Sequence, residues 1–119
     1  MPINSKNKGN VGEREFSKAF NDIFGTCLRR GQQYSGTAES ADVVGLPGVH
    51  FEVKRVQNLN LTKTMEVCEV DCEGKAIPVI AHRKNYKPWL ITIKLEDLAP
   101  FMEAIGDEKF FGAQFLKDL

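Results

Sequence analysis

The sequence predicts a single mixed α/β domain, and three observations support this. The chain has 119 residues, the size of one domain with one hydrophobic core. One segment near the N-terminus has the apolar spacing of an amphipathic helix, and several short runs carry the β-branched and aromatic residues of strands. The expected order is α-β-β-α-β-β-α, with residues 1–10 as a flexible arm and 11–119 as the domain.

The first element is a helix that ends at Gly25 and has Asn10 as its expected N-cap. Its apolar positions follow the i, i+3, i+4, i+7, i+8 pattern: Phe16, Ala19, Phe20, Ile23 and Phe24. At 100° per residue, Glu13 lies roughly 50° from the centre of this apolar face. Glu13 is therefore expected to point inward, although a capping role alone is the alternative.

Two strands follow, at Ala41–Gly45 and Val49–Val56. If the intervening Leu46-Pro47-Gly48 forms a three-residue loop with a left-handed Gly48, residues whose numbers sum to 94 face each other. Asp42 then pairs with Glu52, and Lys54 shares their face. A two-residue turn would instead aim Asp42 at the opposite face.

The remaining elements are two further strands and three helical segments, of which the last two together form the final α of the expected order. A helix over Leu61–Glu73 is expected to be capped by Asn60 or Asn58 and to stop at Gly74. The strands are Ile77–His82 and Trp89–Lys94, with Trp89 in the core, and the last two helices are Glu96–Ile105 and Glu108–Leu116.

Composition excludes some classes of protein. The formal net charge is zero, which argues against a protein that coats DNA through bulk charge but allows a local basic face. No apolar run approaches the roughly 20 residues of a membrane helix, and no signal peptide is recognisable. We therefore expect a cytoplasmic protein.

The three cysteines, Cys27, Cys68 and Cys72, do not suggest a disulfide framework. Cys68 and Cys72 are four residues apart and share a helical face. Packed thiols are favoured over a zinc site completed by His50 or His82, because no second ligand pair with metal-binding spacing is present. His50 itself is expected to be a half-exposed structural residue.

The facing pair Asp42 and Glu52 indicates a cation site. Two facing carboxylates repel each other, and Mg²⁺ is a hard cation that typically takes one or two carboxylates together with waters and phosphate. The alternative is a solvated face on which Lys54 neutralises the acids.

These residues resemble a known family. The arrangement Ala41-Asp42, nine residues, then Glu52-Val53-Lys54 resembles the PD-(D/E)XK nuclease signature, with Ala41 in place of the proline. Four other segments look like those of archaeal-type Holliday junction resolvases: Lys8–Glu15, with its glycine followed by Glu13-Arg14-Glu15, the loop from Arg30-Gly31 to Ser35-Gly36, Ile77–Ala81, and Lys87-Pro88-Trp89. The resemblance covers roughly residues 8–94.

The resemblance implies a restriction-endonuclease-like core and a homodimer that resolves four-way DNA junctions in recombination and repair. It implies that Asp42 and Glu52 hold Mg²⁺, or Mn²⁺ in its place, with Glu13 as a further metal or water ligand and Lys54 orienting the attacking water. The alternatives are a nicking, flap or restriction-type endonuclease on the same fold, and a non-catalytic DNA-binding module.

Candidate DNA contacts come from position and charge. They are Arg29, Arg30, Ser35, Arg55, Gln57, Arg83, Lys84 and Lys87. The first three flank or occupy the loop before Asp42, and the last three belong to a basic run between two strands. A solvated surface is the alternative for Arg29 and Arg30 and for the basic run at 83–87, and a contact that supports the catalytic residues is the alternative for Gln57.

Overall fold

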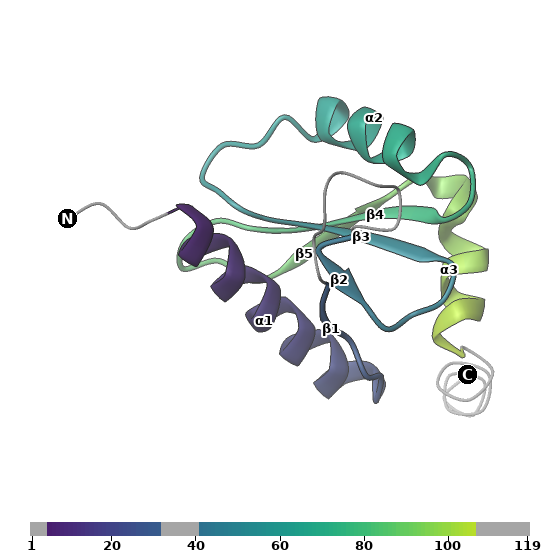
Figure 1. Cartoon of the computed structure of the whole chain (residues 1–119), viewed down its shortest axis with the longest axis horizontal. Helices are drawn as coiled ribbons and strands as arrows, with labels where there is room; N and C mark the ends of the chain where they lie inside the picture. The colour runs from purple at the N-terminus through teal and green to yellow at the C-terminus, as the bar shows by residue number, and fades with distance from the viewer. Residues whose placement is uncertain (1–4, 32–40, 107–119) are drawn as a thin grey trace, which may run out of the picture.

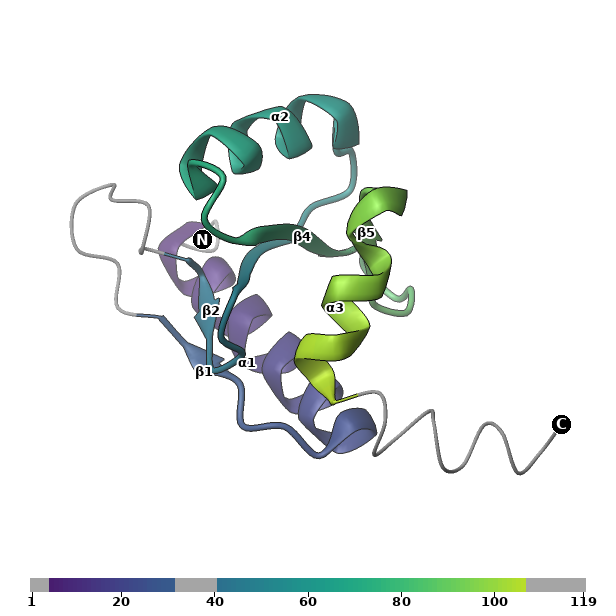
Figure 2. The same cartoon turned by 90° about the vertical axis from the view of Figure 1, so that its right-hand side faces the viewer.

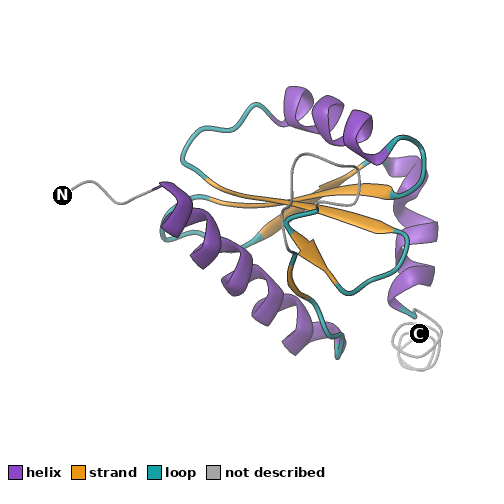
Figure 3. Ribbon diagram, in the orientation of Figure 1, coloured by secondary structure: helices purple, strands orange, loops and turns teal. Residues whose placement is uncertain are grey.

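The computed structural model describes residues 5–31 and 41–106. These residues form a mixed α/β fold with three α-helices and an open five-stranded sheet (Figures 1 and 3). In chain order the elements are α1 (Ser5–Phe24), β1 (Arg29–Arg30), β2 (Val43–Val44), β3 (Val49–Arg55), α2 (Leu61–Cys72), β4 (Ile77–Arg83), β5 (Leu90–Ile93), the 3₁₀ helix η1 (Leu95–Asp97) and α3 (Leu98–Ile105).

The strands lie in the order β1-β2-β3-β4-β5, so neighbours in the chain are neighbours in the sheet. All pairs are antiparallel except β3 and β4, which are parallel. A parallel pair needs a crossover connection, and α2 provides it. The pairing of Val43 with Phe51, together with the left-handed Gly48 at φ +82°, confirms the register expected for β2 and β3.

The helices cover opposite faces of the sheet. Figure 2 shows α2 on one side, while α1 and α3 lie on the other. The core between the sheet and α1 and α3 is aromatic: Phe16 and Phe51 have ring centroids 5.4 Å apart, and Phe51 and Phe101 are 6.3 Å apart. Each fully buried phenylalanine contributes about 1.5–3 kcal/mol, so this layer supplies much of the folding free energy.

The first helix starts earlier than the sequence indicated. It begins at Ser5, so Asn10 is not its N-cap and part of the expected N-terminal arm is helical. Glu13 therefore lies well inside a 20-residue helix, which excludes the capping interpretation. Phe16 and Phe20 are buried as expected, but Ile23 is 60% exposed, whereas the adjacent Phe24 packs against the core.

The strand β1 was not expected. Its two residues are arginines, which carry no local strand signal, and they are extended because Arg30 pairs with Val43 across the sheet. The strand β2 is also shorter than Ala41–Gly45, although the Asp42 N–H still donates to the Phe51 carbonyl at 3.1 Å.

The second half follows the expected order closely. Asn60 caps α2, because its side-chain oxygen accepts a hydrogen bond from the Lys63 N–H at 3.0 Å. Trp89 is half-buried and its ring lies 5.5 Å from that of Phe16. The expected helix 108–116 falls outside the described residues. No helix in the described part of the chain has the length and apolar character to cross a membrane.

Candidate active site

Asp42 and Glu52 come together because of the β2–β3 register. Val43 pairs with Phe51, which is fully buried against α1, so the neighbouring Asp42 and Glu52 share the face covered by α2. The Val53 N–H donates to Asp42 Oδ2 at 2.9 Å. This hydrogen bond from the backbone of β3 orients the Asp42 carboxylate beside Glu52.

Glu52 has an unusual proton affinity. Burial, followed by the charge of Asp42, raises the pKa of Glu52 to about 7, although Lys54 opposes the shift. The Lys54 ammonium lies 3.5 Å from Glu52 Oε1. The lysine does not fully compensate the two acids, so the pair favours a proton or a metal cation at neutral pH.

Glu13 is buried as predicted, with 8% of its surface exposed, and it reaches the neighbourhood of Asp42. Burial raises the pKa of Glu13, and the hydrogen bond from Arg30 counteracts this. Arg30 Nε lies 2.8 Å from Glu13 Oε2. Glu13 is therefore already paired with a cation, and Arg30 is held next to the carboxylate pair.

The ligand atoms of the three predicted acids do not form one compact group. Within residues 5–31 and 41–106, two groups of three potential metal ligands have ligand atoms within 4.8 Å of one another. One group is His50, Cys68 and Cys72, and the other is His50, Glu52 and Asp71. The predicted trio of Glu13, Asp42 and Glu52 is not such a group. The adjacent pair Asp42 and Glu52 still fits Mg²⁺, which typically needs only one or two carboxylates.

A small cavity of about 140 Å³ lies between β3 and α2. Glu52 and Lys54 line it from β3, and Lys63, Thr64, Val67 and Cys68 line it from α2. Lys63 was not predicted from the sequence, since a lysine in the first turn of a helix carries no signal of its own. It adds a second cation to the cavity that holds Glu52.

Two of the residues predicted to contact DNA lie on the face of the sheet that α1 covers, opposite to Lys54. Arg55 and Arg83 lie on neighbouring strands and both approach Glu15 of α1, at 3.6 Å and 2.7 Å. Alternation along β3 places Arg55 opposite Lys54 in direction. These arginines tie the sheet to α1 and are partly neutralised there.

The other predicted contacts are dispersed. Arg29 is exposed and lines a surface hollow with Arg14 of α1. Gln57 accepts a hydrogen bond from the Asn85 N–H at 2.6 Å, which joins the segment after β3 to the β4–β5 loop. Ser35 falls outside the described residues.

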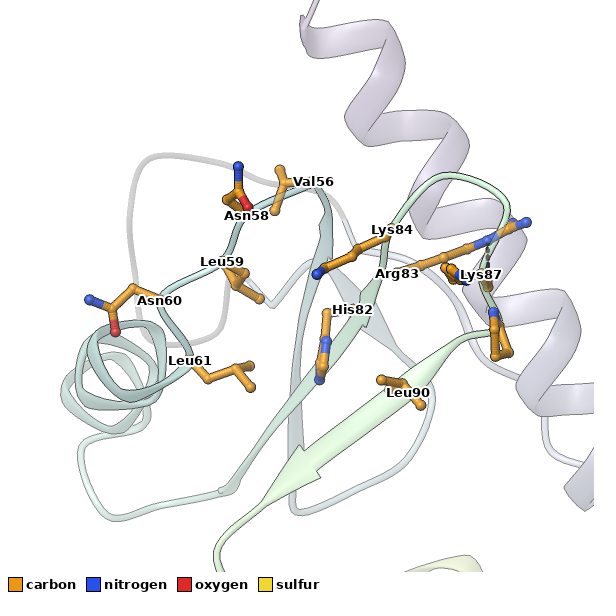
Figure 4. A pocket seen from close by; sticks show the side chains of 11 residues that line it. Val56, Asn58, Leu59, Asn60, Leu61, His82, Arg83, Lys84, Lys87 and Leu90 are labelled. Carbon is orange, nitrogen blue, oxygen red and sulfur yellow. Dashed lines mark hydrogen bonds between the residues drawn. The ribbon is translucent and has the colours of Figure 1, made fainter.

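The remaining pair, Lys84 and Lys87, lies on a large groove of about 920 Å³ (Figure 4). In Figure 4 the His82 ring lies between Leu61, from the start of α2, and Leu90, from β5. Because Lys54 pairs with His82 in the sheet, this groove lies on the same face as the carboxylates, one strand away. A basic rim over an apolar floor therefore lies beside the strand that carries Glu52 and Lys54.

The chain matches no protein-family model, and comparisons with curated proteins and with solved structures gave no match.

Proposed function

We propose that this chain is a Mg²⁺-dependent DNA endonuclease of the Holliday junction resolvase type, built on a restriction-endonuclease-like core. The observation that carries the proposal is the adjacency of Asp42 and Glu52, with Lys54 3.5 Å from Glu52 on the same face. Such a set suits phosphodiester hydrolysis, which needs a divalent cation, an oriented water and compensation of phosphate charge.

Asp42 and Glu52 would hold the magnesium ion, which supplies charge neutralisation at the scissile phosphate when bound. The Val53 N–H keeps Asp42 oriented for this task. The Lys54 ammonium would orient the attacking water, whose oxygen forms the new bond to phosphorus while the bond to one nucleoside oxygen breaks. The water releases a proton to solvent, and the departing oxygen takes one up from solvent. Glu13 positions Arg30 through their ion pair, so that the guanidinium can contact a neighbouring phosphate.

The groove of Figure 4 would guide the DNA backbone to this site. Lys84 and Lys87 are exposed on its rim, and neither forms a salt bridge with an acidic side chain in the described part of the chain. Phosphate contacts from such lysines position DNA without reading its sequence. Two copies related by a two-fold axis would place two sites on a two-fold symmetric junction, which is why we propose a homodimer.

The test uses a labelled synthetic four-way junction, a matched linear duplex, and full-length protein with Mg²⁺ or with EDTA. We expect paired symmetric nicks on the junction that require Mg²⁺ and are lost in Asp42→Asn. Glu66→Gln, an exposed acid on α2, is the matched control and should cut normally.

Other outcomes separate the alternatives. Equal cutting of junction and duplex would retain a nuclease and discard junction selectivity. No cutting with Mg²⁺ or Mn²⁺, together with unchanged junction binding by Asp42→Asn, would replace the nuclease with a non-catalytic DNA-binding module.

A further inference from the structure

Three soft or borderline metal ligands meet between β3 and α2. His50 lies on β3, and Cys68 and Cys72 lie one turn apart on α2. One ligand atom of each lies within 4.8 Å of the other two. All three residues are buried, with 5%, 1% and 3% of their surfaces exposed, so the expectation of a half-exposed His50 is wrong.

The imidazole nitrogens of His50 are available to a ligand. Among the described residues, no hydrogen bond or ion pair involves the His50 side chain. The ring lines a surface cavity, and its nitrogens are not among the buried side-chain atoms that lack a partner in the described part of the chain, so they can be reached from solvent. The nearest polar atoms of ligand type are the two thiols and the carboxylates of Glu52 and Asp71.

We propose that His50, Cys68 and Cys72 form a zinc site, with the Asp71 carboxylate as the fourth ligand. Cys₂His sets with one further ligand are typical of tetrahedral zinc. At zinc–ligand distances of roughly 2.0–2.3 Å, tetrahedral ligand atoms lie roughly 3.3–3.8 Å apart. The separations of up to 4.8 Å among His50, Cys68 and Cys72 therefore need a contraction of about 1 Å, which side-chain rotation can supply, whereas Asp71 lies outside this group and has to turn toward it.

Asp71 is suited to the fourth position. Its carboxylate lies within 4.8 Å of ligand atoms of His50 and Glu52, and its charge also acts on both thiols. Asp71 is exposed, so it can turn toward the metal without disturbing the core. Glu52 stays with Asp42 in the proposed catalytic pair.

The donor chemistry distinguishes this site from the proposed magnesium site. Thiolate and imidazole select zinc, whereas Mg²⁺ prefers oxygen ligands. A surface cavity of about 430 Å³ is lined in part by His50 and Cys72, which gives the ion a route to its ligands. The bound ion would join α2 to β3 and so hold in place the helix that covers Glu52.

The experiment begins with full-length protein, reduced and freed of metal, and titrates it with Co²⁺ as a spectroscopic probe and then with Zn²⁺. We expect one ion per chain, a near-ultraviolet thiolate-to-cobalt absorption band with the visible bands of tetrahedral cobalt, and displacement of Co²⁺ by Zn²⁺ but not by Mg²⁺. A wild-type chain that shows no thiolate-to-cobalt band would overturn the proposal and leave the two cysteines as packed thiols.

Matched variants locate the ligands. Cys68→Ala and Cys72→Ala keep a small apolar group in the core, and each should weaken cobalt binding by about 100-fold or more. Cys27→Ser, which changes the exposed thiol, should bind like the wild type. Circular dichroism checks that each variant folds, and undiminished binding by folded Cys68→Ala would refute the assignment.

One further variant separates this site from the proposed nuclease. Asp42→Asn should retain zinc with wild-type affinity, whether or not the chain cuts DNA. Loss of the cobalt band in Asp42→Asn would refute the zinc ligand set of His50, Cys68, Cys72 and Asp71, while failure of DNA cleavage alone would leave it standing.

Discussion

Replacing Glu52 with glutamine should stabilise the metal-free protein at pH 8, and much less at pH 5. On folding, burial and then the charge of Asp42 raise the pKa of Glu52 from 4.5 to about 7. Between those two values the native state binds the proton more tightly than the unfolded state, so the free energy of unfolding falls as the pH rises. A glutamine keeps the shape of the side chain and removes this titration.

The magnitude follows from the size of the shift. At 1.36 kcal/mol for each tenfold change in proton affinity, the ionised Glu52 destabilises the native state by about 3 kcal/mol above pH 7. About a quarter of its side chain stays accessible to water (23%), which reduces the effect to about 2 kcal/mol. We therefore expect Glu52→Gln to melt roughly 6–12 °C above the wild type at pH 8 in EDTA.

The assay is thermal unfolding followed by circular dichroism at pH 5 and pH 8, for wild type, Glu52→Gln and the control Glu66→Gln. Burial lowers the pKa of His82, and this acts in the opposite direction, so the difference between variants is the informative quantity. The reasoning is refuted if Glu52→Gln and wild type differ equally at both pH values. It is also refuted if the exposed control behaves like Glu52→Gln.

Two further predictions test the loop geometry and the DNA groove. In urea unfolding, Gly45→Ala should lower the free energy of unfolding by at least about 2 kcal/mol more than Gly48→Ala does. Both glycines have positive φ, but only a Cβ at Gly45 would lie 2.6 Å from the Cys27 carbonyl oxygen. Equal losses in the two variants would contradict this close contact. Replacing both Lys84 and Lys87 with alanine should reduce the slope of log K against log salt for junction binding in EDTA by about 2, and an unchanged slope would remove these lysines from the DNA path.

Much of the fold could be predicted because its signals are local. The spacing of Phe16 and Phe20 identified the buried face of α1, and Asn60 identified the start of α2. The three-residue loop ending at Gly48 was enough to predict which residues of β2 and β3 face each other. These features depend on helix geometry, capping and turn conformation, which act over a few neighbouring residues.

Other features could not be predicted because they depend on contacts between distant segments. The two arginines of β1 are extended only because β2 lies beside them, and the pairing of Glu15 with Arg55 and Arg83 joins a helix to two strands. The helix was also expected to start later than Ser5, because residues 5–10 are polar and carry no apolar periodicity.

The sequence by itself determined that Glu52 and Lys54 share one face of a strand, because side chains alternate along it. It placed Asp42 on that face only if Leu46-Pro47-Gly48 forms a three-residue turn, and the structure has that register. Only the tertiary structure decided the surroundings of that face. It paired Glu13 with Arg30 and brought His50 next to Cys68 and Cys72. The physical reason is that packing α1 and α2 on opposite faces of the sheet chooses which side chains meet, and spacing along the chain carries no record of that choice.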